Sequence, residues 1–174
     1  MGIVTKRGDR GMTSLCFGPR VYKDDVRVEA CGALDEVSSF LGLAKSISCD
    51  RNTKKIVSLV QKELITICAE IATPLPAIKK LKKRVKKYSV CALEKEICGL
   101  ENKCMIKMRS FAVPGKNVSS SALDIARAIT RRAERRCVTM ARFGMINNDN
   151  IITYLNRLSD LLYLLARLNE KNKK

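Results

Sequence analysis

Five stretches of this sequence repeat their apolar residues with the period of an α-helix, and no other feature limits the fold as strongly. The clearest stretch runs from about Asn147 to Asn169. Its apolar side chains form one continuous stripe, made by Ile151, Leu155, Leu158, Leu162, Leu165 and Leu168. Apolar residues spaced three and four apart lie on one face of a helix, and that face must pack against other elements.

Four earlier segments carry the same period. They cover about residues 31–44, 50–72, 90–105 and 119–143. Asp50 and the serines at 119–121 are suitable N-terminal caps for two of them. Breaks that contain proline or glycine separate them, at 73–76, 111–115 and 144. We find no convincing strand, so the expected fold is all-α, a five-helix antiparallel bundle.

The domain organisation expected from this pattern is simple. At 174 residues, the chain is expected to form a single domain over residues 1–174. Residues 1–29 contain Gly2, Gly8, Gly11 and Gly18 and are expected to form an irregular arm. Residues 30–170 are expected to form the bundle.

The composition is that of a folded protein, with 46% hydrophobic and 29% charged residues. No apolar run approaches the ~18 residues that a membrane span needs. Lys6, Arg7 and Arg10 are not followed by an apolar segment of the kind found in signal peptides. We therefore expect a cytoplasmic protein with no membrane partner.

Eight cysteines and the absence of histidine limit the metal chemistry. Because the chain has no histidine, a Cys/His zinc site is excluded. Because no two cysteines form a C-x-x-C pair, an all-cysteine site lacks the usual spacing. A catalytic cysteine would have no histidine base. We expect most of the cysteines to be small buried apolar residues and assign no metal ligands.

The net charge of +17 attracts polyanions without identifying one. Seven of the nine residues 79–87 are Lys or Arg. This run is either a solvated basic loop or a patch for nucleic acid or another anion. Tyr88 is the one aromatic residue beside it, which gives little support to a base-stacking site.

One face of the segment 119–143 is rich in arginine. At 100° per residue, that face holds Arg127, Arg131, Glu134 and Arg135. The core-facing side holds Ala126, Ile129, Ala133, Cys137 and Met140. Stacked guanidinium groups repel one another unless carboxylates or an anion neutralise them, and their planar forks suit phosphate oxygens. The arginine face is therefore either a salt-bridge ladder or a phosphate site.

The glycine-containing arm favours the phosphate site. Gly8 and Gly11 allow backbone N–H groups to approach a phosphate closely. Further donors on the arm are Lys6, Thr13, Ser14 and Lys23. The arm is not a Walker A loop, because the G-x-x-x-x-G-K-[ST] pattern is absent.

Two other polar residues stand next to apolar stripes. Asp35 follows Leu34, and we expect it on the core-facing side of the first helix with a cationic partner. Asn156 offers both a donor and an acceptor, as is needed to bind an adenine edge or a ribose.

These blocks resemble one family, the PduO-type ATP:cob(I)alamin adenosyltransferases. The matching text is T-K-R-G-D-R-G-M-T-S, K-D-D-V-R-V-E-A-C-G-A-L-D-E-V-S-S-F-L-G-L-A, A-T-P, F-A-V-P-G, A-R-A-I-T-R-R-A-E-R-R and Y-L-N-R-L-S-D, in this order and over nearly the whole chain. The resemblance implies a homotrimer of five-helix bundles with active sites between subunits. It also implies transfer of the 5′-deoxyadenosyl group of ATP to the cobalt of cob(I)alamin, which gives adenosylcobalamin and tripolyphosphate.

The resemblance also implies site residues. The ATP-binding positions are Thr5, Lys6, Arg7, Gly8, Thr13, Ser14, Lys23, Arg131, Arg132, Glu134, Arg135 and Asn156. The implied catalytic residues are Arg131, an ion pair of Asp35 and Arg127 across the subunit interface, and Phe111 under the lower face of the corrin. ATP is the implied co-substrate, Mg²⁺ the cofactor and cobalamin the substrate. A flavoprotein reductase or a cobalamin-dependent enzyme is the implied protein partner, and nucleic acid is not one.

The chain departs from the family pattern at two places, with Leu123-Asp124 for a Leu-His pair and Pro114-Gly115-Lys116 for Pro-Gly-Gly. Two other functions stay open on the sequence alone. A basic helical nucleic-acid-binding module fits the net charge but gives no reason for Asp35 or Glu134. A non-catalytic carrier of ATP or cobalamin would keep the same pocket.

Overall fold

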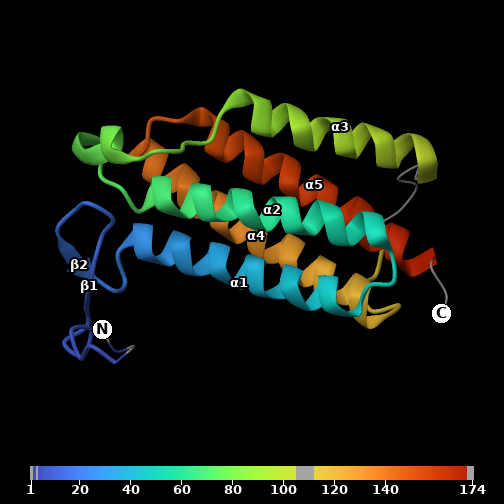
Figure 1. The fold of residues 1–174 in the computed structure, drawn as a ribbon, viewed down its shortest axis with the longest axis horizontal. Coiled ribbons are helices and arrows are strands. Elements are labelled where there is room, and N and C mark those ends of the chain that lie inside the picture. Colours follow the sequence, from blue (N-terminus) through green and yellow to red (C-terminus); the bar gives the residue numbers. More distant parts are fainter. Residues whose placement is uncertain (1, 3, 105–111, 172–174) are drawn as a thin grey trace.

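Five long helices form a bundle in the computed structural model, which describes residues 2, 4–104 and 112–171 (Figure 1). They are α1 (Val26–Ile47), α2 (Arg51–Ile71), α3 (Lys87–Cys104), α4 (Val118–Arg142) and α5 (Asp149–Lys171). Successive helices run in opposite directions (Figure 1). The antiparallel all-α bundle expected from the periodicity is therefore confirmed.

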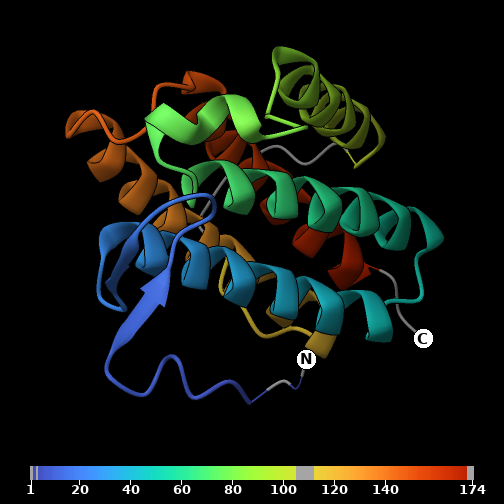
Figure 2. The same cartoon turned by 60° about the vertical axis from the view of Figure 1, so that its left-hand side comes forward.

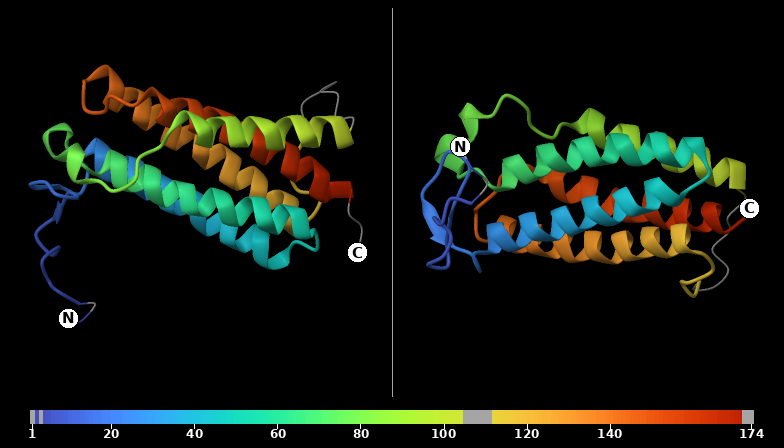
Figure 3. Two further views of the ribbon diagram at one scale, coloured as in Figure 1. Left: turned by 45° about the horizontal axis from the view of Figure 1, so that its top comes forward. Right: turned by 60° about the horizontal axis from the view of Figure 1, so that its bottom comes forward.

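Helix α4 packs against both α1 and α5 (Figures 2 and 3). In turn, α2 packs on α1, and α3 packs on α5. The stripe predicted on the last helix is buried: Ile151, Leu155, Leu158, Leu162 and Leu165 are 0% exposed. Burial of each such side chain contributes roughly 1.5–3 kcal/mol, so α5 supplies a large share of the apolar core.

Polar side chains at the helix starts accept backbone N–H groups that have no partner within the helix. Asp50 accepts from the Thr53 N–H at 2.7 Å, as the sequence predicts. Asn117 caps α4 through a reciprocal pair of bonds with Ser120, so this cap lies before the expected serines. Asp25 caps α1, which therefore begins at Val26 rather than near residue 31.

Arg27 is a buried cation that the periodicity does not predict. Its guanidinium donates to the backbone carbonyls of Ile71 at 2.6 Å and Met145 at 2.7 Å. Burial lowers the pKa of Arg27 from its usual value. The side chain joins the start of α1 to the end of α2 and to the α4–α5 connection, so it holds one end of the bundle together.

The arm before α1 contains a short hairpin, and the expectation of no strand is wrong. Strands β1 (Met12–Ser14) and β2 (Arg20–Tyr22) pair antiparallel, with Thr13 opposite Val21. Three residues are too few for an alternating pattern to be recognised in a sequence. The arm is fixed to the bundle where the Cys16 N–H donates to the Ala72 carbonyl at 3.0 Å.

The basic run is only partly a loop. A 3₁₀ helix, η1 (Leu75–Lys80), covers its beginning, and α3 starts at its last residue. All six lysines of the run are exposed. Arg84 instead pairs with the buried Glu70 at 2.8 Å. Glu70 also accepts the backbone N–H of Val85 and the side chain of Asn148, both at 2.9 Å.

The cysteines are less buried than expected, so that prediction is wrong for most of them. Of the seven cysteines whose side chains are described, Cys137 is buried, while Cys49 and Cys98 are exposed. All seven are free thiols. Burial, with a smaller contribution from Glu134, raises the pKa of Cys137 to about 12.

No helix within the described ranges is long and apolar enough to cross a membrane.

Replacement of Glu70 by alanine should lower the free energy of unfolding by about 1–3 kcal/mol, because the buried Val85 N–H then loses its acceptor. Urea denaturation followed by circular dichroism measures this change. Glu96→Ala, an exposed glutamate on α3, is the matched control and should stay within about 0.5 kcal/mol of the wild type. Equal effects of the two substitutions would contradict the anchoring role of Glu70.

Candidate functional site

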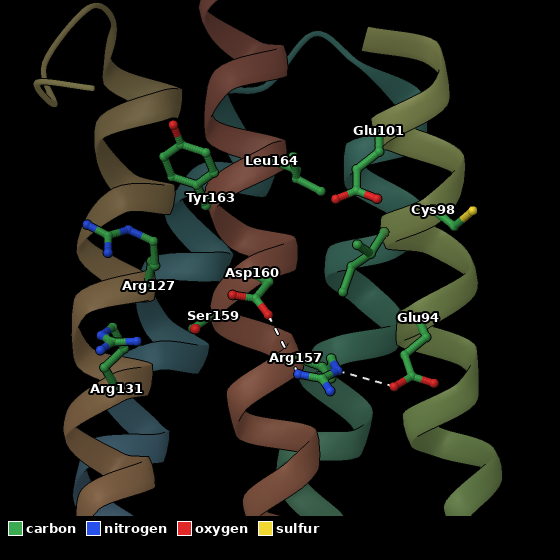
Figure 4. A pocket seen from close by; sticks show the side chains of 11 residues that line it. Glu94, Cys98, Glu101, Arg127, Arg131, Arg157, Ser159, Asp160, Tyr163 and Leu164 are labelled. Carbon is green, nitrogen blue, oxygen red and sulfur yellow. Dashed lines mark hydrogen bonds and ion pairs between the residues drawn. The ribbon is translucent and has the colours of Figure 1, made fainter. Parts of the chain in front are cut away.

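A pocket of about 420 Å³ opens between α3, α4 and α5. It is lined by Glu94, Ile97, Cys98 and Glu101 from α3, by Arg127 and Arg131 from α4, and by Arg157, Ser159, Asp160, Tyr163 and Leu164 from α5. Figure 4 shows Arg127 and Arg131 one above the other along α4, with Tyr163 and Ser159 of α5 beside them. The lining therefore combines three arginines and three carboxylates with an apolar and aromatic wall, and two of those carboxylates, Glu94 and Asp160, pair with Arg157.

The position of the arginines follows from how α4 packs. The core side predicted for this helix is correct, because Ala126, Ala133, Cys137 and Met140 are 0% exposed and Ile129 is buried as well. With that side fixed against α1 and α5, Arg127 and Arg131 must point toward the pocket. Arg131 and Arg135 are exposed, and neither guanidinium has a hydrogen bond or ion pair with the described part of the chain.

Two further arginines of the helix, Arg132 and Arg136, face α1 instead. Arg132 forms an ion pair with Glu36, and Arg136 forms one with Glu29 at 3.5 Å. All four side chains are about half exposed. The chain therefore does not bring Arg132 into the pocket with Arg131, although both belong to the predicted ATP-binding set.

Glu134 and Asn156 are brought together, as the predicted set requires. The Asn156 side-chain amide donates to Glu134 Oε1 at 3.1 Å. Its carbonyl oxygen accepts from Arg157 Nη1 at 2.9 Å. Arg157 also pairs with Glu94 of α3 at 3.1 Å, so the orientation of the Asn156 amide is fixed from both sides. Arg157 lines the pocket but was not among the predicted site residues, although it lies in the Y-L-N-R-L-S-D block.

Asp35 does not lie on the core-facing side of α1, and that expectation is wrong. Leu34 is 1% exposed, but the next residue is turned about 100° around the helix and Asp35 is exposed. Asp35 makes no ion pair within the described residues of the chain. Arg127, its expected partner, pairs with Asp124 of its own helix at 3.4 Å.

The predicted residues of the arm lie outside the pocket. Thr5, Lys6, Arg7, Ser14 and Lys23 are exposed, and Gly8 and Thr13 are half-buried. Lys23 Nζ reaches to 3.1 Å from the position that a Cβ on Gly8 would take, so a side chain at Gly8 would displace it. Gly11 has a φ of +71°, which favours glycine. In Figures 1 and 3 the segment before β1 extends away from the helices.

Phe111 lies outside the described residues, so its predicted place under the corrin is not tested.

Asp124 and Lys116, at which the chain departs from the family pattern, belong to one ion-pair network. Asp124 pairs with Arg167, and Arg167 pairs with Glu170 at 3.0 Å. Lys116 reaches Glu170 from the other side at 3.2 Å. Asp124, Arg167 and Glu170 have side chains that are at most 7% exposed.

Comparisons with known proteins give a consistent result. The sequence matches the family described as Cobalamin adenosyltransferase over residues 3–169. It is 37% identical to a corrinoid adenosyltransferase of Citrobacter freundii over 171 residues, which are 97% of this chain and 94% of the relative. It is 34% identical to the human corrinoid adenosyltransferase, with 95% of this chain and 67% of the relative covered. It is also 35% identical to the corrinoid adenosyltransferase PduO of Salmonella typhimurium, but spans only 51% of that protein.

Solved structures agree with the sequence comparisons. A phenylalanine-to-histidine variant of a PduO-type ATP:corrinoid adenosyltransferase from Lactobacillus reuteri, complexed with cobalamin and ATP, superposes with a TM-score of 0.85 at 32% identity. The match covers 95% of this chain and 89% of that chain. An arginine-to-lysine variant complexed with ATP gives a TM-score of 0.82, also at 32% identity, over 95% of this chain and 93% of that chain.

The attachment of the arm depends on a close contact at Gly18. A Cβ there would lie 2.7 Å from Pro74 Cγ, so Gly18→Ala should move the arm away from the end of α2. We expect trypsin to cleave after Arg20 several-fold faster, while the thermal unfolding of the helices stays unchanged. Gly32→Ala on α1, where a Cβ meets nothing within 4 Å, is the control. Equal cleavage rates in both variants would show that the Gly18 contact does not hold the arm.

Proposed function

The chain belongs to the cobalamin adenosyltransferase family, and from this premise we propose that it transfers the 5′-deoxyadenosyl group of ATP to the cobalt of cob(I)alamin. The observation that carries the proposal is the pocket where Arg131, which has no partner in the described chain, stands one turn from Arg127. Guanidinium groups left without carboxylate partners favour a polyanionic ligand over a salt-bridge ladder. The nucleic-acid-binding alternative has no support from the comparisons.

The reaction needs position and charge neutralisation more than acid–base chemistry. Cob(I)alamin is itself a strong nucleophile, so its attack on C5′ of ATP requires no general base, in keeping with a chain without histidine. A cobalt–carbon bond forms, the C5′–O5′ bond breaks, and the electron pair leaves with tripolyphosphate. Arg131 and Arg135 would stabilise the charge that develops on this leaving group. Fixed geometry between C5′ and cobalt supplies the rest of the acceleration.

Adenosine recognition falls to Asn156 in this proposal. Glu134 and Arg157 hold its amide at 3.1 Å and 2.9 Å, so the orientation of its donor and acceptor is set before ATP binds. An amide fixed in this way binds without the entropy cost of ordering a free side chain.

The complete site would form between two chains of a homotrimer. No arm residue lines the pocket that contains Arg127 and Arg131, which supports the proposal that the arm of a neighbouring chain completes the site. Asp35 is exposed and Arg127 keeps 31% of its side chain exposed, which leaves both accessible for the ion pair across the interface. Phe111 would cover the lower face of the corrin and keep water from cobalt.

Mg²⁺ is the metal that we propose for the triphosphate. Across residues 2, 4–104 and 112–171, no group of three or more His, Cys, Asp or Glu side chains could hold a metal ion. Mg²⁺ commonly binds through one or two carboxylates together with substrate phosphates, so it does not require such a cluster. Glu134 would be the protein ligand, and the ion would help neutralise the leaving group.

We place the enzyme in the cytoplasm, because free thiols at all seven described cysteines suit a reducing compartment. A flavoprotein reductase would supply cob(I)alamin, or a cobalamin-dependent enzyme would accept the product.

Arg131→Ala should lower kcat/KM for adenosylcobalamin formation by at least about 10²-fold, because the leaving triphosphate loses a cationic donor. Anaerobic assays with ATP, Mg²⁺ and chemically reduced cobalamin measure this. Arg142→Ala, at the exposed end of the same helix, is the matched control and should retain activity. A wild-type protein that binds both substrates without turnover would instead be a carrier.

Mixed trimers test whether each site combines two chains. Lys6→Ala and Arg131→Ala should each be inactive alone, and co-expression in equal amounts should restore about a quarter of the wild-type activity. The reason is that half of the arms and half of the α4 helices are intact, so roughly one interface in four has both. Sites built within single chains would give no recovery.

A further inference from the structure

The ion-pair network of Asp124, Arg167, Glu170 and Lys116 contains a buried carboxylate, Asp124, that accepts hydrogen bonds from two arginines. Asp124 is 5% exposed and lies on α4, one turn before Arg127. Its Oδ2 accepts from Arg167 Nη2 of α5, and its Oδ1 accepts from Arg127 Nε at 3.4 Å. With each oxygen bound to a different guanidinium, the carboxylate cannot rotate without breaking a contact.

Arg167 is equally restricted. It is 6% exposed, and its Nε and Nη1 atoms have no hydrogen-bond partner among the described residues. Asp124 and Glu170 therefore compensate its charge, and a buried charge that loses such a partner is strongly destabilised. The need to compensate the buried charge of Arg167 keeps Asp124 in place, because Asp124 is the carboxylate of α4 that pairs with Arg167.

The network touches the pocket at two points. One is Arg127, through Asp124. The other is Tyr163, whose ring centroid lies 5.2 Å from Arg167 Cζ, a distance at which a cation and a ring attract. Both Arg127 and Tyr163 line the pocket (Figure 4).

We propose that Asp124, locked by Arg167, is a positioning residue that holds the guanidinium of Arg127 at the pocket wall for adenosyl transfer. The inference rests on the proposed role of Arg127. Asp124 itself does not line the pocket, so it acts through Arg127 and touches neither substrate. Among the described residues, Asp124 is the one partner of Arg127 and binds only its Nε, so the remaining donors of Arg127 can contact a neighbouring chain.

A double-mutant cycle tests the proposal. Asp124→Asn keeps the shape of the side chain but removes its charge. It should lower kcat/KM by between about tenfold and a hundredfold, mainly through kcat, because Arg127 is no longer held in place. In an Arg127→Ala background, the same substitution should lower kcat/KM less than about twofold. Its effect on the melting temperature should be similar in both backgrounds, because Arg167 loses one of its two carboxylate partners in each.

The outcomes separate the possible failures. An equal loss of kcat/KM in both backgrounds overturns the positioning role and leaves Asp124 as a structural residue. Wild-type activity of Arg127→Ala overturns the proposed role of Arg127 instead, and no turnover by the wild type overturns the proposed function. Asp149→Asn, at the exposed start of α5, is the matched control and should leave turnover unchanged.

A second variant covers the case in which Asp124→Asn does not fold. Arg167→Lys keeps a positive charge opposite Asp124 but loses the planar fork that fixes the carboxylate. It should reduce kcat/KM in the wild-type background and have little further effect when Arg127 is alanine. Equal losses in the two backgrounds would again overturn the proposal.

Discussion

The packing of α4 against α1 and α5 is the constraint on which the rest of the structure depends. Small side chains on its core side, such as Ala126 and Ala133, allow the helices to approach closely. Once that side is buried, the directions of all the arginines on α4 follow from the helical period. The core of the bundle thus decides which cations reach the pocket and which face solvent.

The carboxylates around α4 then divide its arginines into two groups. Glu29 and Glu36 on α1 pair with the outward arginines, and Asp124 pairs with Arg127. The two exposed pairs with α1 stabilise the fold little. They affect the distribution of charge instead: Glu29 and Glu36 neutralise arginines that face α1, whereas Arg131 beside the pocket has no partner among the described residues. A ligand with several negative oxygens is the natural complement to this arrangement.

Several local features could be predicted from the sequence because they depend on neighbouring residues alone. The stripe on α5, the core side of α4 and the cap at Asp50 are all of this kind. The hairpin at Met12–Ser14 and Arg20–Tyr22 was missed, since three-residue strands carry no usable period. The expectation that Asp35 faces the core is wrong because adjacent residues of a helix point about 100° apart, so the neighbour of the buried Leu34 can face solvent.

The sequence by itself determined the five helices and the family, since helical period and motif order are properties of the linear chain. The tertiary structure alone decided that the arm residues lie outside the pocket of their own chain. It also decided that Asp124, Arg167, Glu170 and Lys116 meet in one network, although 43 positions separate Asp124 from Arg167. Ion pairs between distant segments depend on how the helices pack, and no local pattern records them.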